Sequence, residues 1–439
     1  VCGYALPAFG QSIWFNERSR MVLVYVLDNH KRPLMPTTPV MARILLKQGR
    51  AKVVRKLPFT IKLQYNIVAA QVAPLTLGVD TGSSTLGSAV TDDKGNVLYL
   101  SEVAIRNDIA EKMTRRREYR RNRRYRKTRY RLPGSENRKN SIKSDRFSPT
   151  MRSKIDSHLK EIRFVESILP IKATILETAS FDPHALKNPE VLANPLLYQQ
   201  GINYGFANTK AYVLDRDSYT CQHCAGKSKD RRLHVHHIIF RTNGGSDEEE
   251  NLVTLCKTCH VELHAGSISL KLTGKKKGQL RHATQMNSIR VQLLKRLPEA
   301  RETFGYITKE HRQLFTDVKD HSVDAVFIAT QGMKPIFKTS LVIQKKCVSD
   351  GDYRQTRGAR SEECIPTGKI MGFRKFDATF YRGERYFIMG RMSTGYAILM
   401  NIAGETVKLK PIPKLHLMAR AAARKSWIIS QRTMANVCS

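Results

Sequence analysis

Alternation of apolar and polar residues predicts a small folded unit near the start of the chain. VLVYVLD, which begins at Val22, has the pattern of a strand, and KRPLMPTTP after it is a proline-stiffened turn. MARILLKQGRAKV has the spacing of a short helix and leads into PFTIKLQY, a second strand. In residues 75–105 apolar residues alternate with turns, and the sequence DDKG marks a hairpin turn. We therefore expect a small unit at residues 21–66 and then a β-meander that opens a larger α/β domain.

The rest of the chain mixes helical and strand patterns. A helix is predicted at residues 151–168, and residues 171–182 (IKATILETASFD) form an apolar strand that carries one acid. Two further helices are predicted, one within the basic stretch 274–298 and one at 318–331. Towards the C-terminus strand and turn patterns return, which predicts a small β-rich domain closed by a helical tail around Ala421.

Residues 108–132 form a strongly basic block. Twelve of the twenty residues from Lys112 to Arg131 are Lys or Arg, with three tyrosines between them and no Gly or Pro. Blocks of like charge are usually disordered tails, but this one is internal and begins with Asp108 and Glu111, which suit a helix N-terminus. A helix with arginines on every side is stable only against a polyphosphate, so we favour a helix bound to nucleic acid. The arginines expected to bind it, to RNA under the family resemblance given below, are Arg115, Arg116, Arg117, Arg120, Arg121, Arg123, Arg124 and Arg126.

The net charge also indicates a polyanionic partner. The 439 residues include 75 Lys or Arg against 38 Asp or Glu, a formal charge of +37, while the hydrophobic content of 41% argues against general disorder. Such a charge repels itself unless a polyanion neutralises it, and nucleic acid would bind with strong salt dependence. An anionic membrane is the alternative, but no apolar run reaches the roughly 18 residues that a bilayer span needs.

The eight cysteines are arranged as a metal site rather than as a disulfide framework. Four of them form two CxxC pairs separated by 31 residues, and the other four are scattered, which is typical of a reducing interior. Two CxxC pairs can complete a closed tetrahedral zinc site, with free thiols as the alternative. The predicted zinc ligands are Cys221, Cys224, Cys256 and Cys259.

Histidines gather between and after these cysteine pairs. His236 and His237 follow a strand pattern, a Gly-Gly turn and Asn251 come next, and His260 and His264 lie four residues apart, on one face of a helix. A strand, loop and helix that hold one metal ion beside a neutral imidazole form a compact phosphodiesterase. A zinc ribbon with incidental histidines is the alternative, but the ordered combination HH, GG, N and CxxCH favours a nuclease.

This ordered combination resembles the HNH, or ββα-metal, nuclease family. The resemblance implies that His237 is the general base and that His236 is a ligand of the catalytic metal. Asn251 would either hold the loop or touch the metal, because branches of the family differ on this point. His260 would be a further metal ligand, and His264 is an additional candidate.

Acidic residues far apart in the sequence suggest a second centre. LGVDTGSSTLG ends a buried strand at Asp80, with glycines that permit close approach of a phosphate. Glu177 lies on another apolar strand, and His321 and Asp324 share one helix face. Several converging carboxylates are what two Mg²⁺ ions need to activate water. Taken singly, each acid is also explained as a turn former, a strand-edge charge or a helix-surface residue.

Together these acids resemble the three segments of a RuvC-like nuclease, a member of the RNase H superfamily. Asp80 would belong to the first segment, Glu177 to the second, and His321 with Asp324 to the third, as catalytic residues of which the three acids bind metal. Their order around the HNH module and the arginine block is similar to that of the IscB family, transposon-encoded RNA-guided nucleases related to the CRISPR type II effectors. KRPLMPTTP contains the PLMP motif that names the N-terminal domain of that family.

The resemblance implies an α/β multidomain fold in which an HNH module is inserted into an RNase H-like (RuvC) mixed sheet. It implies Mg²⁺ or Mn²⁺ at both nuclease sites, structural Zn²⁺, a guide (omega) RNA, and a double-stranded DNA target with a short flanking motif. The HNH site would cut the guide-paired strand and the RuvC-like site the displaced strand. We expect a monomeric ribonucleoprotein in a bacterial or archaeal cytoplasm, associated with the nucleoid and not with a membrane. A guide-independent HNH endonuclease and a non-catalytic RNA-binding transposon accessory protein are the alternatives.

The same resemblance divides the chain into segments. The first 20 residues lack the pattern of a signal peptide, and Met21 directly precedes the first strand, so we assign them no role. The expected segments are 1–20 as an N-terminal extension, 21–66 as the PLMP domain, 75–106, 133–195 and 271–335 as RuvC-like segments I, II and III, 108–132 as the bridge helix, 196–270 as the HNH domain with its zinc ribbon, and 336–439 as a C-terminal domain that contacts RNA and the target motif.

Overall fold

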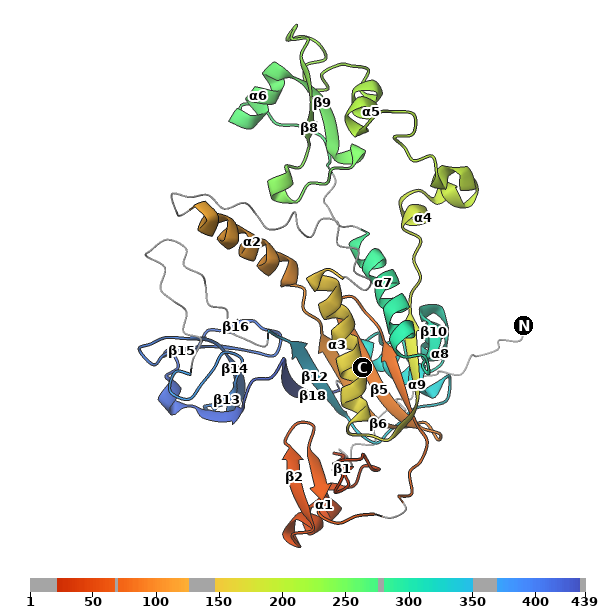
Figure 1. The fold of residues 1–439 in the computed structure, drawn as a ribbon, viewed down its shortest axis with the longest axis vertical. Helices are drawn as coiled ribbons and strands as arrows, with labels where there is room; N and C mark the ends of the chain where they lie inside the picture. The colour runs from red at the N-terminus through yellow and green to blue at the C-terminus, as the bar shows by residue number, and fades with distance from the viewer. Residues whose placement is uncertain (1–21, 68–69, 126–146, 275–279, 350–368, 435–439) are drawn as a thin grey trace, which may run out of the picture. The chain divides into compact units, whose positions relative to one another are not determined.

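The computed structural model describes residues 22–67, 70–125, 147–274, 280–349 and 369–434. The expectations for residues 1–20 and for Arg126 lie outside this part of the chain. The chain divides into two compact units, which we call the sheet unit (residues 1–179 and 288–439) and the inserted unit (residues 180–287). The fold is of the α/β multidomain class, as the sequence predicts (Figure 1).

A three-stranded sheet follows the first described residues. It has the order β1 (Tyr25–Leu27), β3 (Thr60–Leu63) and β2 (Ala51–Arg55), and helix α1 (Pro39–Lys47) connects β1 to β2. Thr38 caps this helix by accepting a hydrogen bond from the backbone of Met41, and Pro39 occupies the first helical position, where a missing N–H costs nothing. The two predicted strands and the helix are present, but the expectation that the helix continues to Val53 is wrong, because Ala51–Arg55 form β2 and pair with β3.

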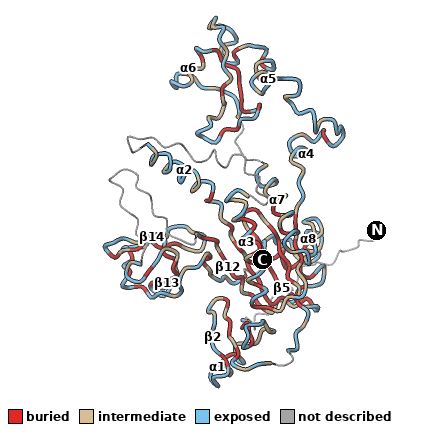
Figure 2. Tube along the Cα trace, viewed as in Figure 1, coloured by how far each residue is buried: buried red, intermediate tan, exposed pale blue. Residues whose placement is uncertain are grey.

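The central sheet of the sheet unit has eight strands. β4 (Leu75–Asp80), β5 (Thr85–Asp92) and β6 (Asn96–Ala104) are the predicted meander, and β7 (Ile171–Thr178) and β10 (Arg301–Phe304) pair beside β4 in parallel. On the other side β6 pairs with β11 (Ile336–Phe337) and β12 (Leu341–Cys347), and β18 (Trp427–Thr433) closes that edge. Figure 2 shows buried residues along these strands, which form the core of the unit.

Helices cover both faces of the central sheet. Helix α9 (His321–Thr330) packs closely on β4 and β5, because Gly78 leaves room for it: a Cβ there would overlap the carbonyl oxygen of Ala325. Helix α3 (Pro149–Glu166) lies on the opposite face, where Glu161 accepts hydrogen bonds from two sheet serines and pairs with buried Lys345. The remaining helices of this region are α2 (Ile109–Tyr125), α7 (Arg281–Arg296) and α8 (Gly305–Gln313).

A second, five-stranded sheet forms the C-terminal part of the sheet unit. Its order is β16 (Thr406–Val407), β15 (Ala397–Met400), β14 (Glu384–Arg391), β13 (Ala378–Tyr381) and β17 (Ala419–Ala422). The prediction of a helical tail around Ala421 is wrong, because β17 pairs with β13 and β18 joins the central sheet. Pairing with an existing strand outweighs the helix propensity of an alanine-rich run.

The inserted unit is built around a two-stranded antiparallel sheet and a helix. β8 (Leu233–His237) pairs with β9 (Leu252–Cys256), and α6 (Lys257–Ala265) follows β9 directly. The unit also contains α4 (Pro183–Lys187), α5 (Thr209–Arg216) and four short 3₁₀ helices, η2 (Pro189–Leu192), η3 (Pro195–Tyr198), η4 (Arg241–Asn243) and η5 (Glu249–Asn251). Its core combines the apolar side chains of β9 with the four cysteines of the CxxC pairs.

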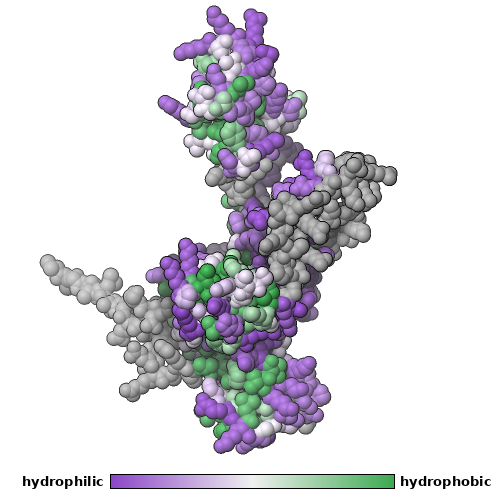
Figure 3. Space-filling model, turned by 90° about the vertical axis from the view of Figure 1, so that its left-hand side faces the viewer, coloured by the Kyte–Doolittle hydropathy of each residue, from purple (hydrophilic) through white to green (hydrophobic). Residues whose placement is uncertain are grey.

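Figure 3 shows one face of the molecule, on which hydrophilic residues predominate. On the face shown in Figure 3, polar residues surround smaller apolar groups, in keeping with the net charge of +37. No helix in the described ranges is long and apolar enough to cross a membrane.

Candidate active sites

The two adjacent histidines of β8 lie on opposite faces of the strand. Successive side chains alternate in a strand, so His236 is buried at 5% exposure while the side chain of His237 is 21% exposed. Cys256, the last residue of β9, caps helix α6: its Sγ accepts a hydrogen bond from the backbone of Cys259 at 3.5 Å. The result is the predicted strand, loop and helix with both histidines at the end of β8.

Three histidines form a cluster between β8 and α6. One ring nitrogen from each of His236, His260 and His264 lies within 4.8 Å of the others, and Nε2 of His236 is 3.2 Å from Nε2 of His264. The ring centres of His260 and His264 are 4.7 Å apart, as their four-residue spacing on the helix requires. Both helix histidines that the sequence pointed to are therefore in reach of the same ion as His236.

The electrostatics of this cluster fit a cation. Burial, and then the neighbouring His260 and His264, lower the pKa of His236 to about 4. Burial also lowers the pKa of His260. These shifts keep the imidazoles neutral, which is the form that binds metal. In addition, Nδ1 of His236 is buried without a hydrogen-bond partner.

His237, the predicted general base, makes different contacts. Its Nε2 lies 2.9 Å from Oδ1 of Asp247, and Nε of Arg241 lies 2.7 Å from the same oxygen. The sequence prediction did not include Asp247 or Arg241. Both belong to the loop between β8 and β9, where charged residues are common, so no sequence signal separated these two from their neighbours.

Asn251 is tied into the loop between β8 and β9. Its Oδ1 accepts a hydrogen bond from the backbone of Ile239 at 2.9 Å, and its Nδ2 donates to the carbonyl oxygens of Ile239 and Ser246 at 3.1 and 2.8 Å. The residue is fully buried. Of the two roles that the sequence left open, these bonds favour holding the loop.

The four CxxC cysteines converge on one point. Their sulfur atoms all lie within 4.8 Å of one another, and Sγ of Cys224 is 3.8 Å from Sγ of Cys256. Tetrahedral coordination with zinc–sulfur bonds of about 2.3 Å separates the sulfurs by roughly 3.8 Å. Hydrogen bonding with the Ser228 side chain lowers the pKa of Cys224 to about 6, which favours the thiolate that zinc requires. The cluster therefore fits a structural Zn²⁺ ion.

The separate acids of the sheet unit meet at the ends of neighbouring strands. Asp80 and Glu177 are register partners in the parallel pair of β4 and β7, so their side chains leave the same face of the sheet. Helix α9 lies on that face, and Nδ1 of its first residue, His321, is 2.5 Å from Oδ2 of Asp80. This hydrogen bond is the largest cause that raises the pKa of His321.

Crowding of negative charge is evident at Glu177. Burial, followed by repulsion from Asp80, raises the pKa of Glu177 to about 7, and its Oε2 is buried without a hydrogen-bond partner. Burial also raises the pKa of Asp324, although the guanidinium of Arg312 lies 3.1 Å away. A site that leaves acids this crowded is suited to a cation.

The acids are nevertheless less closely gathered than the histidines. Within the described ranges, the groups of three or more ligand atoms mutually within 4.8 Å are the cysteine and histidine clusters, and the sheet acids form no such group. Arg312, which the sequence prediction did not include, occupies the place of a cation beside Asp324. A metal ion at this site would compete with that arginine.

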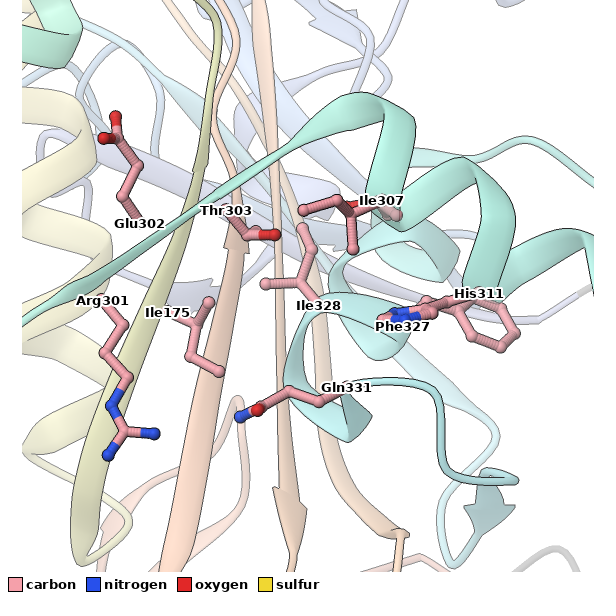
Figure 4. Close-up of a pocket in the computed structure, with 10 residues that line it drawn as sticks. Ile175, Arg301, Glu302, Thr303, Ile307, His311, Phe327, Ile328 and Gln331 are labelled. Atoms are coloured by element: carbon pink, nitrogen blue, oxygen red, sulfur yellow. The ribbon is translucent and has the colours of Figure 1, made fainter.

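A cavity of about 280 Å³ adjoins the acids on the same face of the sheet. Ile175 and Thr303 contribute to it from β7 and β10, and Phe327 and Ile328 from α9, with Arg301 and Gln331 at its lower end in Figure 4. Thr303 is the register partner of Glu177 and Ile175 lies two residues before Glu177 on β7, so the cavity lies beside the acid. It is a neighbouring feature of the sheet and contains none of the predicted site residues.

Helix α2 contains most of the predicted RNA-binding arginines. Arg115, Arg116, Arg117, Arg120 and Arg121 are exposed along it, Arg124 is half-buried, and Arg126 lies beyond the described residues. For Arg123 only the helical backbone is described. Ion pairs of Lys112 with Asp108 and of Arg115 with Glu111 stabilise the first turns. Most of the positive charge remains in solvent.

Comparison with protein families identifies two domains. Residues 24–201 match the family described as RRXRR protein, and residues 221–266 match the HNH endonuclease family. The first match includes the sequence RRNRR at residues 120–124 of α2, and the second includes every predicted zinc and histidine ligand. The chain therefore contains one region similar to RRXRR proteins and one region similar to HNH endonucleases, the class of metal-dependent DNA-cutting domain that the sequence predicts.

Individual relatives match short parts of the chain. A type IV methyl-directed restriction enzyme of Escherichia coli, EcoKMcrA, is 36% identical over 61 residues, which are 12% of this chain and 22% of the enzyme. Anaredoxin of Nostoc sp. is 29% identical over 69 residues, 16% of this chain and 88% of that protein. The chain thus spans about a fifth of the restriction enzyme's length.

Two solved structures of Cas9 proteins are also similar. Streptococcus thermophilus Cas9, in complex with the AGAA PAM, matches 55% of this chain and 32% of its own with a TM-score of 0.32 and 10% identity. The type II-C Cas9 of Actinomyces naeslundii matches 60% of each chain with a TM-score of 0.22 and 12% identity. These TM-scores are too low to establish a shared fold, and the assignment above rests on the two family matches.

Proposed function

We propose that this protein is a metal-dependent DNA endonuclease of the IscB type, guided by RNA, with an HNH centre in the inserted unit and a RuvC-like centre in the sheet unit. The observation that carries the proposal is the histidine cluster beside His237, within a matched HNH endonuclease domain. The RRXRR match and the arginines of α2 add the nucleic-acid-binding part. The segment boundaries given above are part of the same proposal.

At the HNH centre, His236, His260 and His264 would hold one divalent cation. A bound Mg²⁺ or Mn²⁺ ion polarises a phosphate and stabilises the leaving oxygen. His237 occupies the adjacent position of β8 and is not part of the cluster, so its imidazole would remain without metal and take a proton from the attacking water. Asn251 keeps the loop in place rather than coordinating the ion.

At the RuvC-like centre, Asp80, Glu177 and Asp324 would share the metal-binding role. Burial, followed by repulsion from Asp80, disfavours the charged carboxylate of Glu177 in the absence of a cation, and burial does the same for Asp324; a bound cation would reverse both effects. His321 is held by Asp80 at the rim of the site, where its ring can orient a water molecule or a phosphate. Binding of metal would release Asp324 from Arg312.

RNA guidance is supported by the basic helix and by the order of the domains. Exposed arginines along α2 suit the phosphates of a structured omega RNA, and the net charge of +37 calls for a large polyanion. In this arrangement base pairing supplies target specificity, while the protein grips backbones and reads a short flanking motif. The HNH centre would cut the guide-paired strand and the RuvC-like centre the displaced strand.

A strand-resolved nicking assay tests this proposal. The ribonucleoprotein is purified with its RNA, the RNA is sequenced, and a matching DNA duplex is prepared with a different label on each strand. We expect His237→Ala to remove cutting of the guide-paired strand alone and Asp80→Ala to remove cutting of the displaced strand alone, each by about 100-fold or more.

The control is Asp215→Ala, which removes an exposed carboxylate of α5 in the inserted unit and should leave both cuts intact. Survival of both cuts in either active-site variant would contradict the assignment of the centres. Loss of both cuts in either variant would show that the two activities are not separate.

A guide-independent HNH endonuclease is the second candidate. It is favoured by the 61-residue stretch of the chain that is similar to a methyl-directed restriction enzyme. Digestion of the copurified RNA separates the two candidates. Cutting that continues at the same sites after RNase treatment supports the restriction-type alternative, and cutting that stops supports guidance.

A further inference from the structure

We propose that Asp247 is a positioning residue for the general base His237, and that Arg241 both holds Asp247 and offers its free guanidinium nitrogens to the DNA phosphate. The inference rests on the proposed nuclease function of the HNH centre and deepens it. It assigns roles to two loop residues outside the metal cluster.

The contact with Asp247 determines which nitrogen of His237 can act as a base. A carboxylate only accepts hydrogen bonds, so we assign to Nε2 of His237 the hydrogen that Asp247 receives at 2.9 Å. The hydrogen of Arg241 Nε then goes to Asp247 at 2.7 Å rather than to Nε2 of His237 at 3.3 Å. The lone pair of the neutral ring is then on Nδ1. A carboxylate in this position fixes the orientation of the imidazole and stabilises the imidazolium that forms when Nδ1 takes a proton.

Arg241 fixes the carboxylate in turn. Its Nε donates to Oδ1 of Asp247 at 2.7 Å and lies 3.3 Å from Nε2 of His237, so the three groups meet at one oxygen. Charge-assisted bonds of this kind are shorter and stronger than neutral ones. Since both Arg241 and Asp247 are more than half exposed, the pair adds little to stability, and a structural role explains it poorly.

The backbone around the pair is rigidly built. Arg241 opens the short helix η4, and Asp247 directly follows Ser246, whose carbonyl oxygen is held by buried Asn251. The same asparagine binds both backbone groups of Ile239. Gly245 packs so closely that a Cβ would overlap the carbonyl oxygen of Ile239. Through these backbone hydrogen bonds Asn251 fixes the loop that carries Arg241 and Asp247 next to His237.

The remaining donors of Arg241 point to a phosphate ligand. Its side chain is 65% exposed, and within the described ranges only its Nε has a protein partner. The two terminal nitrogens can therefore bind one nonbridging phosphate oxygen while Nε keeps Asp247 in place, which the planar guanidinium allows and a lysine does not. DNA binding and orientation of the base would then be coupled through one side chain.

The proposed step conserves atoms and charge. The oxygen of a water molecule forms a bond to phosphorus as Nδ1 of His237 takes one of its protons. The bond between phosphorus and the leaving ester oxygen breaks, and that oxygen takes its electron pair and is protonated from solvent. Asp247 stays ionised throughout and stabilises the temporary imidazolium.

The test uses the complete ribonucleoprotein and the labelled duplex, or, if cutting proves RNA-independent, the protein with plasmid DNA. Asp247→Ala should lower kcat at the HNH-cut strand about 10- to 100-fold, with KM for DNA changed less than about twofold. Arg241→Ala should raise KM as well, and Arg241→Lys should restore KM only in part. In a His237→Ala background, Asp247→Ala should cost nothing further, because it acts through His237.

Several outcomes would overturn the proposal. An unchanged kcat in Asp247→Ala, while His237→Ala is inactive, removes the positioning role and leaves the proposed nuclease function intact. A further loss in the double variant, or a lowered melting temperature in Asp247→Ala but not in the Asp215→Ala control, makes the role structural. Absence of cutting by the wild-type protein, with and without its RNA, instead defeats the proposed function itself.

Discussion

The histidine centre of the inserted unit and the acid centre of the sheet unit differ in how their residues are brought together. His236, His260 and His264 come from one strand and the helix that follows the next strand, and their ligand atoms lie within 4.8 Å. Asp80, Glu177 and Asp324 come from three elements spread over 245 positions of the chain, and Arg312 stands among them. The ligand atoms of the first centre are already close enough for one cation, whereas in the second Arg312 offsets the charge of Asp324 alone.

A compact motif can therefore form a metal site through local structure, whereas acids dispersed along the chain come together only when the whole sheet has formed. Strand alternation and a four-residue helix spacing are enough to gather the histidines. The acids require the parallel pairing of β4 with β7 and the docking of α9 on glycine positions. Perturbations of the two units should therefore have different consequences.

Removal of a zinc ligand should give the largest effect, because it should unfold one unit and leave the other folded. We expect Cys256→Ser to unfold the inserted unit, since structural zinc binding supplies about 10 kcal/mol or more of folding free energy in small zinc domains. The central sheet should remain folded. Hydrogen exchange measured by mass spectrometry would show protection lost in residues 209–265 and kept in β4–β7. Protection that survives in both, with zinc absent by elemental analysis, would contradict a structural zinc role.

Substitution of Arg312 tests whether a metal ion can replace this arginine at the acid centre. Arg312→Met leaves Asp324 without its cationic partner, and loss of one member of a largely buried pair costs about 3 kcal/mol. Millimolar Mg²⁺ should reverse most of the resulting decrease in melting temperature. Arg290→Met is the matched control, because Arg290 pairs with Glu302 and neither belongs to the acid centre. Equal rescue of both variants by Mg²⁺ would count against a metal site at the acids.

Asn251 offers a smaller test within the histidine centre. Asn251→Asp keeps an acceptor for Ile239 but loses the donor to two carbonyl oxygens, so we expect a loss of about 2 kcal/mol in the free energy of unfolding. A metal ligand would behave differently, because a carboxylate binds divalent cations better than an amide. Tighter Mn²⁺ binding by calorimetry, with unchanged stability, would restore the metal-ligand alternative.

The arginines of α2 should give the smallest change per residue. Replacement of Arg116, Arg117 and Arg120 by Ala should weaken RNA binding and reduce the slope of log affinity against log salt by about 0.7 to 0.9 for each lost phosphate contact. A filter-binding titration at four salt concentrations measures both. The control is replacement of three exposed basic residues of α1 and β2, Arg43, Lys47 and Lys52. An unchanged slope in the α2 variant would argue against RNA on this helix.

Much of the molecule could be predicted from the sequence because its signals are local. The meander of β4 to β6, helix α3 and the strand, loop and helix of the inserted unit follow from apolar periodicity and turn residues. The cysteine and histidine clusters follow from short spacings. The strand at Ala419–Ala422 could not be predicted, since its partner strand is 40 residues away and alanine favours helix.

The same reasoning explains which site residues were missed. Arg312 reaches Asp324 from a different helix, and no spacing rule connects α8 to α9 through their side chains. Asp247 stands in the acidic run SDEEEN, where only the three-dimensional loop distinguishes it from the glutamates beside it. Contacts made by tertiary structure leave no periodic signal in the chain.

The parallel pairing of β7 with β10 has a consequence for synthesis on the ribosome. The 122 residues from 179 to 300 separate these neighbouring strands, so the edge of the sheet stays incomplete until the whole insertion has been translated. The equilibrium cost is modest, because loop-closure entropy grows only with the logarithm of length and lengthening a 15-residue connection to this size costs about 2 kcal/mol. The burden is temporal instead: at 5–20 residues per second, about 6 to 24 seconds pass with Glu177 on an unpaired edge. In a nascent chain of this protein, Glu177 would therefore be exposed to solvent before either nuclease centre is complete.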